Sequence, residues 1–131
     1  MVIMKKILLS TLMFICGIAS VSAQAEIKFD KLLNDFGTFS ETSPVVTCTF
    51  NFTNVGDQPL VINQAVASCG CTVPEYTKDP VKPGEKGSIK VTYNGTGKFP
   101  GHFKKSITVR TNGKVEMTRL YIEGTMEEKK D

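Results

Sequence analysis

The sequence predicts an all-β protein, built as a sandwich of about seven short strands. From Glu26 almost to the end of the chain, apolar and polar residues alternate with a period of two, as they do in strands that have one buried face. Clusters of Gly, Pro, Asn and Asp interrupt the alternation about every ten residues, a spacing typical of sandwich turns. No stretch has the roughly 3.6-residue period of an amphipathic helix.

The first 23 residues are expected to form a secretory signal peptide. A short basic start precedes the apolar run Ile7–Ile18, and small residues follow it as far as Ala23. This order is typical of export signals. The apolar run is shorter than the ~20 residues that a membrane-spanning helix needs. Cleavage after Ala23 would leave residues 24–131, and cleavage after Ala25 is the alternative.

The composition of the mature chain indicates one domain in an oxidising compartment. The domain is expected over residues 24–125, followed by a charged, flexible tail at 126–131. After cleavage, 14 basic residues nearly balance 13 acidic ones, which argues against nucleic acid as a partner. No second apolar stretch is long enough to form a transmembrane segment. Export and four encoded cysteines predict a periplasmic or extracellular location.

The sequence of the first half of the domain predicts two strands, one before and one after a turn. Glu26–Asp30 alternates, Asn34–Gly37 contains the residues of a turn, and Val45–Asn54 alternates again. The apolar residues of this last strand fall on one face: Val46, Cys48, Phe50 and Phe52. Its other face is rich in threonine, so the strand should be half-buried.

The middle of the domain predicts one inner strand and one edge strand. Leu60–Val66 alternates, but Gln64 interrupts its apolar face, which suggests a β-bulge or a sheet edge. The inward residues of this strand are expected to be Leu60, Ile62 and Val66. Thr72–Lys78 is expected to be a short edge strand, because Pro74 has no amide donor.

The last third of the domain predicts three strands. Ser88–Tyr93 and Phe103–Arg110 flank a loop rich in Gly and Pro, Asn94–His102. Their inward residues are expected to be Ile89, Val91, Tyr93, Ile107 and Val109. A turn then leads to Val115–Gly124, in which the apolar positions change phase, so a β-bulge is expected near Thr118.

Five motifs in the chain resemble those of a known family. They are Phe52–Leu60, Cys69–Cys71, Pro83–Gly84, Gly101–Phe103 and Tyr121–Gly124. They resemble the immunoglobulin-like domains of the Hydin and major-sperm-protein type. Within that group they resemble the secreted bacterial family called domain of unknown function 1573, in which a Ser-Cys-Gly-Cys-Thr segment recurs. The resemblance covers about Asp35 to Gly124 and implies a seven-stranded immunoglobulin-like β-sandwich. It implies no established activity, because such sandwiches serve many roles.

Cys69 and Cys71 are the strongest candidates for a functional site. Only Gly70 separates them, and an extended strand would hold their Cα atoms ~6.6 Å apart. That distance is near the limit for a disulfide, so a bend at the glycine is required. The residues leave three interpretations open: a structural pair, a redox pair or a soft-metal site. Two thiolates suit Cu(I), whereas Zn(II) needs about four ligands.

The third candidate ligand is His102, the only histidine of the chain. In an immunoglobulin-like sandwich its loop and the Cys69–Cys71 loop lie at the same end, so His102 could approach the sulfurs. Otherwise it is a solvated loop residue. Cys48, in mid-strand, is expected to be a core thiol. If its strand formed a hairpin with the next one, Cys48 would lie opposite Ala65, too far from Cys69 for a disulfide.

These observations favour a non-enzymatic protein. One histidine and scattered acidic residues do not form the catalytic set of a hydrolase. The leading hypothesis is an exported binding or assembly module whose partner is another protein, engaged through an edge strand or end loops. The alternative is a copper-binding or thiol-redox protein that uses Cys69 and Cys71, with His102 as a further ligand of Cu(I).

Overall fold

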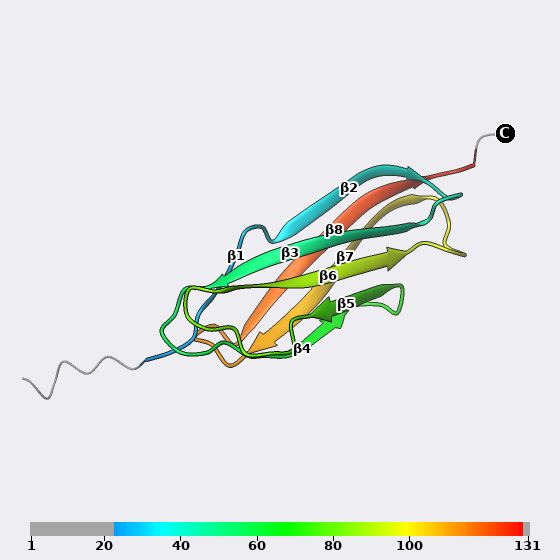
Figure 1. The fold of residues 1–131 in the computed structure, drawn as a ribbon. Coiled ribbons are helices and arrows are strands. Elements are labelled where there is room, and N and C mark those ends of the chain that lie inside the picture. Colours follow the sequence, from blue (N-terminus) through cyan, green and yellow to red (C-terminus); the bar gives the residue numbers. More distant parts are fainter. Residues whose placement is uncertain (1–22, 130–131) are drawn as a thin grey trace, which may run out of the picture.

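A computed structural model describes residues 23–129 of the chain. The predicted signal peptide, apart from Ala23, and the last two residues of the predicted tail lie outside these described residues. Residues 23–129 fold into eight β-strands and contain no helix that could cross a membrane (Figure 1). The strands are β1 (Ile27–Phe29), β2 (Leu33–Ser40), β3 (Val45–Asn54), β4 (Ile62–Ala67), β5 (Thr72–Tyr76), β6 (Lys86–Asn94), β7 (Gly101–Thr111) and β8 (Met117–Glu127).

The strands form two four-stranded sheets that pack against each other (Figure 1). Sheet A has the order β1-β3-β6-β5, and sheet B has the order β2-β8-β7-β4. Neighbouring strands are antiparallel, except that β2 and β8 are parallel. The predicted all-β, immunoglobulin-like sandwich is therefore confirmed. It has one strand more than expected, because the chain changes sheet between β1 and β2 and so forms two strands there.

The core lies between the inner faces of the two sheets. Its large, fully buried side chains come mainly from the four central strands: Phe50 and Phe52 of β3, Ile89 and Val91 of β6, Ile107 and Val109 of β7, and Leu120 and Ile122 of β8. Removing one such side chain from water contributes about 1.5–3 kcal/mol to stability. The period-two alternation of the sequence identifies this core correctly, because successive side chains of a strand point to opposite faces.

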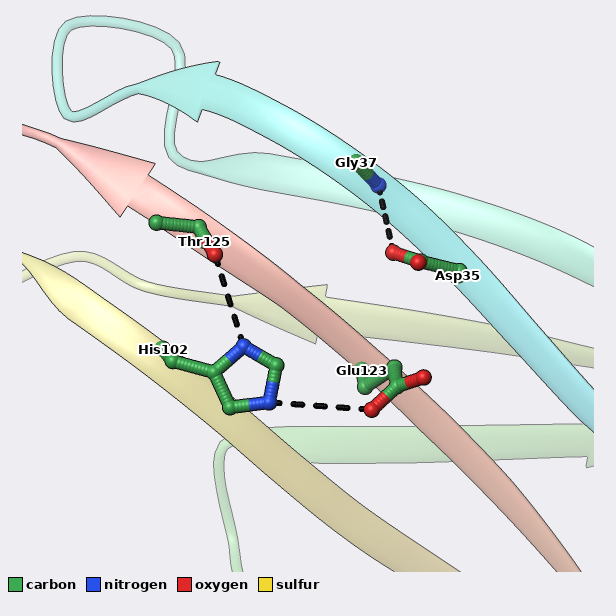
Figure 2. Close-up of polar contacts among 5 residues, drawn as sticks. All are labelled: Asp35, Gly37, His102, Glu123 and Thr125. Carbon is green, nitrogen blue, oxygen red and sulfur yellow. Dashed lines mark hydrogen bonds and ion pairs between the residues drawn. The ribbon is translucent and has the colours of Figure 1, made fainter.

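The turn predicted at Asn34–Gly37 is wrong, because these residues belong to β2. The pairing register of β2 with β8 shifts between Asp35 and Thr38, and Gly37 has a φ of 70°. The Gly37 N–H donates a hydrogen bond of 2.8 Å to Oδ1 of Asp35 (Figure 2). Asp and Gly, the residue types of a turn, thus form a β-bulge inside a strand.

The last strand also differs from its prediction. β7 and β8 pair without a register shift from Met117 to Met126, so there is no bulge near Thr118. Val115 lies in the turn before β8 and Met117 is exposed, so neither belongs to a second inward phase. β8 continues to Glu127 with Met126 only 3% exposed, which takes the strand past the predicted domain boundary at residue 125.

The irregularity predicted at Gln64 is present in β4. The pairing register of β4 with β7 shifts between Ile62 and Gln64. The shift turns Ala65 and the later Ala67 toward the core. The prediction that Val66 faces inward is therefore wrong, and its side chain is exposed.

Candidate functional site

The Ser68–Cys71 segment connects sheet B to sheet A, between the end of β4 and the start of β5. Main-chain hydrogen bonds fix both ends of this connection. The Ser68 N–H donates to the carbonyl of Ser106 in β7 at 2.9 Å, and the Asn94 N–H of β6 donates to the carbonyl of Cys71 at 2.8 Å. The two cysteines thus lie at a corner that is held by both sheets.

A disulfide bond joins Cys69 and Cys71, whose Cα atoms are 5.4 Å apart. This separation lies within the usual disulfide range of ~4.4–6.8 Å. Gly70 has no left-handed backbone angle, and a Cβ atom placed there would meet nothing within 4 Å. The expected bend between the cysteines is present, but it does not depend on the conformational freedom of glycine.

Thr72 is a member of this corner that sequence reasoning missed. Its side chain is 3% exposed, and its hydroxyl lies 3.9 Å from the sulfur of Cys69 and 3.8 Å from that of Cys71. A hydroxyl so placed can donate to either sulfur, and most strongly to a thiolate formed on reduction. Its position directly after Cys71 is the signal that could have identified it.

His102 does not lie in a loop, because β7 already begins at Gly101. Its ring nitrogens face Thr125 and Glu123 of β8: Nδ1 is 3.4 Å from the Thr125 hydroxyl, and Nε2 is 3.6 Å from the Glu123 carboxylate (Figure 2). Ser106, which bonds to Ser68 beside the cysteines, is four residues further along β7, or ~13 Å. The structure therefore groups His102 with Glu123 and Thr125 and not with the disulfide.

Cys48 is a free thiol that points inward from β3 at the side of the sandwich. It pairs across the sheet with Val91 of β6 and not with Ala65, because β3 and β4 belong to different sheets. Burial raises the pKa of the Cys48 thiol to about 11, and the nearby Lys31 ammonium opposes this shift. The thiol is therefore protonated at neutral pH and has the character of a core residue.

No cluster of three or more His, Cys, Asp or Glu side chains that could hold a metal ion occurs in residues 23–129. Cys69 and Cys71 are two potential sulfur ligands once their disulfide is reduced. A third protein ligand would have to come from elsewhere, since His102 is directed toward β8.

A second candidate site is the edge of β3 beyond the end of β1. β1 pairs only with Phe52–Asn54, and the Asp30 N–H then donates to the Asn51 carbonyl. The N–H and C=O groups of Asn54 form hydrogen bonds with the segment before β6. Main-chain groups of successive residues in a strand point to opposite sides, so those of Thr47 and Thr49 face the β1 side. No strand in the described part of the chain pairs with them there.

Solved structures place this fold in a known class. A PapD-like domain of human CEP192 superposes with a TM-score of 0.66 at 8% identity, covering 85% of this chain and 92% of that one. A protein of unknown function from Porphyromonas gingivalis W83 superposes with a TM-score of 0.67 at 14% identity, covering 82% of this chain and 50% of that one. The periplasmic chaperone SfaE gives a TM-score of 0.55 at 9% identity, with 80% and 59% covered. The protein is thus an immunoglobulin-like domain of PapD-like architecture.

The family assignment agrees with the motifs of the sequence. Residues 27–126 match the model of a family described as "Protein of unknown function (DUF1573)". The chain belongs to this family. A search of curated proteins found no matching sequence. The chain spans half the length of the Porphyromonas gingivalis protein, and at these identities the solved structures define the fold alone.

Proposed function

We propose that the protein is an exported, non-enzymatic module that binds another protein by strand addition at the free edge of β3. The observation that carries this proposal is the unpaired main chain of Thr47 and Thr49. Each residue offers one amide donor and one carbonyl acceptor on that side. An extended segment of a partner can add there as a further strand, as in other complexes that form by β-augmentation.

The terminal strands of the two sheets carry features that hinder such pairing. β1 has only three residues, and bulges interrupt β2 and β4. Cys71 and Thr77 flank β5 at its two ends. The Cys71 carbonyl accepts a hydrogen bond from Asn94 of β6, and the Thr77 N–H donates one to Ser88 of β6. Because main-chain groups alternate along a strand, the nitrogen of Pro74, which has no hydrogen, faces the open side of β5. These are the usual protections of sheet edges.

The free part of β3 has none of these protections. Within the described residues, Val45–Phe50 has no partner on the β1 side, and it contains no charged residue, no proline and no glycine. Such segments pair readily with other strands. Phe50 and Phe52 are fully buried, whereas Val46 and Cys48 on the same face are only half-buried. The sandwich is therefore open at this edge, and apolar side chains of an added strand can cover it. An unprotected edge supports a binding role.

The proposed absence of enzymatic activity is supported by the state of the reactive side chains. The His102 ring contacts Glu123 and Thr125 on the outer sheet face. Cys69 and Cys71 are oxidised, and Cys48 keeps its proton at neutral pH. None of these groups is arranged as a nucleophile beside a base.

Export is supported by two observations. The first 23 residues have the composition of a signal peptide, and a disulfide such as Cys69–Cys71 persists in oxidising compartments. SfaE, which has the same fold, is a periplasmic chaperone. We infer a periplasmic or extracellular location.

Site-specific photo-cross-linking in the producing cell tests the strand-addition proposal. A photoreactive amino acid replaces Thr47 at the free edge or, as a control, Lys90 on the exposed face of β6. Protein adducts are expected from position 47 and not from position 90. Thr49→Pro removes an outward amide donor and should abolish the adducts, while an edge proline is tolerated by the fold. Adducts that persist in this variant, or that form equally from position 90, would exclude strand addition at β3.

A second candidate function uses the disulfide corner. Cys69 and Cys71 are joined beside an exposed glycine, with the Thr72 hydroxyl near both sulfurs. A dithiol could reduce this bond to two thiols and become a disulfide itself, with no other atoms lost. The two sulfurs would then be ligands for Cu(I). We propose this thiol-redox or copper-binding role as the alternative to protein binding.

Copper titration with thiol counting separates the two candidates. The native protein should show one free thiol, and the protein treated with a mild dithiol should show three and bind one Cu(I). Cys69→Ser or Cys71→Ser should abolish that binding, whereas His102→Ala should leave it unchanged because the ring faces β8. Failure of the reduced protein to bind Cu(I) would remove the copper-binding role.

A further inference from the structure

The outer face of sheet B carries a site that neither proposed function uses. Arg110 and Arg119 are the only two arginines of the chain, and its other basic side chains, apart from the single histidine, are lysines. Both arginines line the same hollow of about 480 Å³ at the surface. Arginine binds planar oxyanions through a rigid fork of donors, which lysine lacks.

The strand register brings the two arginines together. Two successive rows cross the outer face of β4, β7 and β8: Gln64, Arg110 and Met117, then Val66, Thr108 and Arg119. Arg110 and Arg119 are therefore diagonal neighbours, ~7–8 Å apart on adjacent strands. The neighbouring Val109 and Leu120 are fully buried, so alternation directs both guanidinium groups outward.

Neither guanidinium is neutralised by the rest of the described chain. The single ion pair in residues 23–129 joins His102 to Glu123. Glu123 is four residues beyond Arg119 in β8, or ~13 Å along the strand. Two like charges on neighbouring strands repel each other, and an anion bound between them would relieve this repulsion.

The other residues of the hollow indicate which class of ligand bears the anionic group. Three hydroxyl side chains, Ser68, Ser106 and Thr108, line it beside the arginines and can donate to an oxyanion. Val66 lines the hollow and is 47% exposed. Met117 is paired with Arg110 across β7 and β8 and is 41% exposed, so it extends the apolar border. A ligand that matches both features has a carboxylate next to an apolar group. An acidic polypeptide segment fits this description, whereas a sulfated glycan offers nothing to the apolar border.

We propose that this hollow binds the carboxylate of an Asp or Glu side chain that lies beside an apolar residue in a partner polypeptide. Arg110 and Arg119 hold the carboxylate oxygens, and Val66 and Met117 contact the apolar neighbour. This site rests on the proposed protein-binding function only because its ligand is a protein. It does not require strand addition at β3.

NMR of the nitrogen-15-labelled protein, purified as the expressing cells process it, tests the site directly. With two arginines, the protein has two arginine Nε–H signals. The probe is a capped pentapeptide, Leu-Glu-Val-Glu-Leu, and its control has Gln in place of both Glu residues. Both arginine signals should shift with the Glu peptide and not with the Gln peptide. Arg110→Lys and Arg119→Lys should each weaken binding about tenfold, and Lys90→Gln on sheet A should leave it unchanged.

The amide spectrum of each variant verifies its fold in the same experiment. Absence of a shift in both arginine signals, equal shifts with the Gln peptide, or stronger binding of a sulfated polysaccharide or of anionic vesicles would overturn the proposal. The cross-linking result at Thr47 is independent. Adducts at the β3 edge without a peptide response at the arginines would retain strand addition and eliminate this site, and the reverse would retain the site alone.

Discussion

Asn54 shows how much of the structure depends on one buried polar residue. Its fully buried side chain donates to the carbonyls of Gln58 at 2.7 Å and Val81 at 2.9 Å. It also accepts from the N–H groups of Gly56 at 3.0 Å and Glu26 at 3.3 Å. One side-chain amide thus joins three segments: the residues before β1, the β3–β4 connection and the β5–β6 connection. A buried amide of this kind is stabilising only while all its partners remain paired.

We expect Asn54→Ala to destabilise the domain by about 2–4 kcal/mol, because it removes four hydrogen bonds to main-chain groups and leaves a gap where a fully buried side chain stood. Asn51→Ala is the matched control on the exposed face of the same strand, and it should change stability by no more than about 0.5 kcal/mol. Urea unfolding followed by circular dichroism measures both. Equal losses in the two variants would contradict this account of Asn54.

Cys48 gives a prediction that depends on pH. Burial raises the pKa of its thiol in the folded state from 9.0 to about 11. Because the folded pKa is the higher one, the stability that the thiol contributes is complete below pH 9 and is lost as pH rises through about 11. Cys48→Ala should cost about 1–3 kcal/mol at neutral pH through lost burial. The difference in stability between wild type and variant should shrink between pH 9 and 11, and a constant difference would show that the thiol is not desolvated.

At the scale of elements, the segment before β1 is firmly docked. Ala25 is 2% exposed and belongs to the core. The Gln24 N–H donates to the Asp57 carboxylate at 2.8 Å, and the Asp57 N–H donates to the Gln24 carbonyl at 3.0 Å. A Cβ atom on Gly56 would overlap the main chain of Gln24 and Ala25. The segment therefore packs directly on the backbone of the connection that follows β3.

This docking favours one of the two predicted signal-peptide cleavage sites. Cleavage after Ala25 would remove a buried core residue and both hydrogen bonds to Asp57, whereas cleavage after Ala23 keeps them. We therefore predict that the exported protein begins at Gln24. Intact-mass measurement of the mature protein decides the question, and a mass that corresponds to a start at Glu26 would refute the prediction.

Glycine substitutions test the same packing. Gly56→Ala should destabilise the domain by about 1–3 kcal/mol, since the added methyl group must displace the docked segment. Gly70→Ala is its control, because a Cβ atom at Gly70 meets nothing within 4 Å and the expected change is within about 1 kcal/mol. Thermal unfolding compares the two. A larger effect at Gly70 would show that the disulfide corner needs glycine after all.

At the scale of the whole molecule, alternation predicts the strands well because one sheet face is buried. Val45–Asn54 was predicted with its observed bounds for this reason. The Asp35–Gly37 bulge was not, since a turn and a bulge use the same residue types. The pairing of Cys69 and Cys71 needs only their proximity in sequence. Three features could not be predicted in this way: the contacts of His102, the free edge at Thr47 and the proximity of the two arginines. They depend on where strands begin and on the order of strands in each sheet, which the alternation of apolar and polar residues does not specify.

The parallel pairing of β2 with β8 has a mechanical consequence. In Figure 1 the chain enters at one end of the sandwich and leaves at the other. β2 is the first long strand and β8 the last, and they lie side by side in the same direction. Tension applied to the two chain ends would pull these strands past each other along their length. The hydrogen bonds between them would then be loaded together, in shear, instead of opening one after another like a zipper. In shear the load is shared among these hydrogen bonds, so separating β2 from β8 takes more force than unzipping an antiparallel pair.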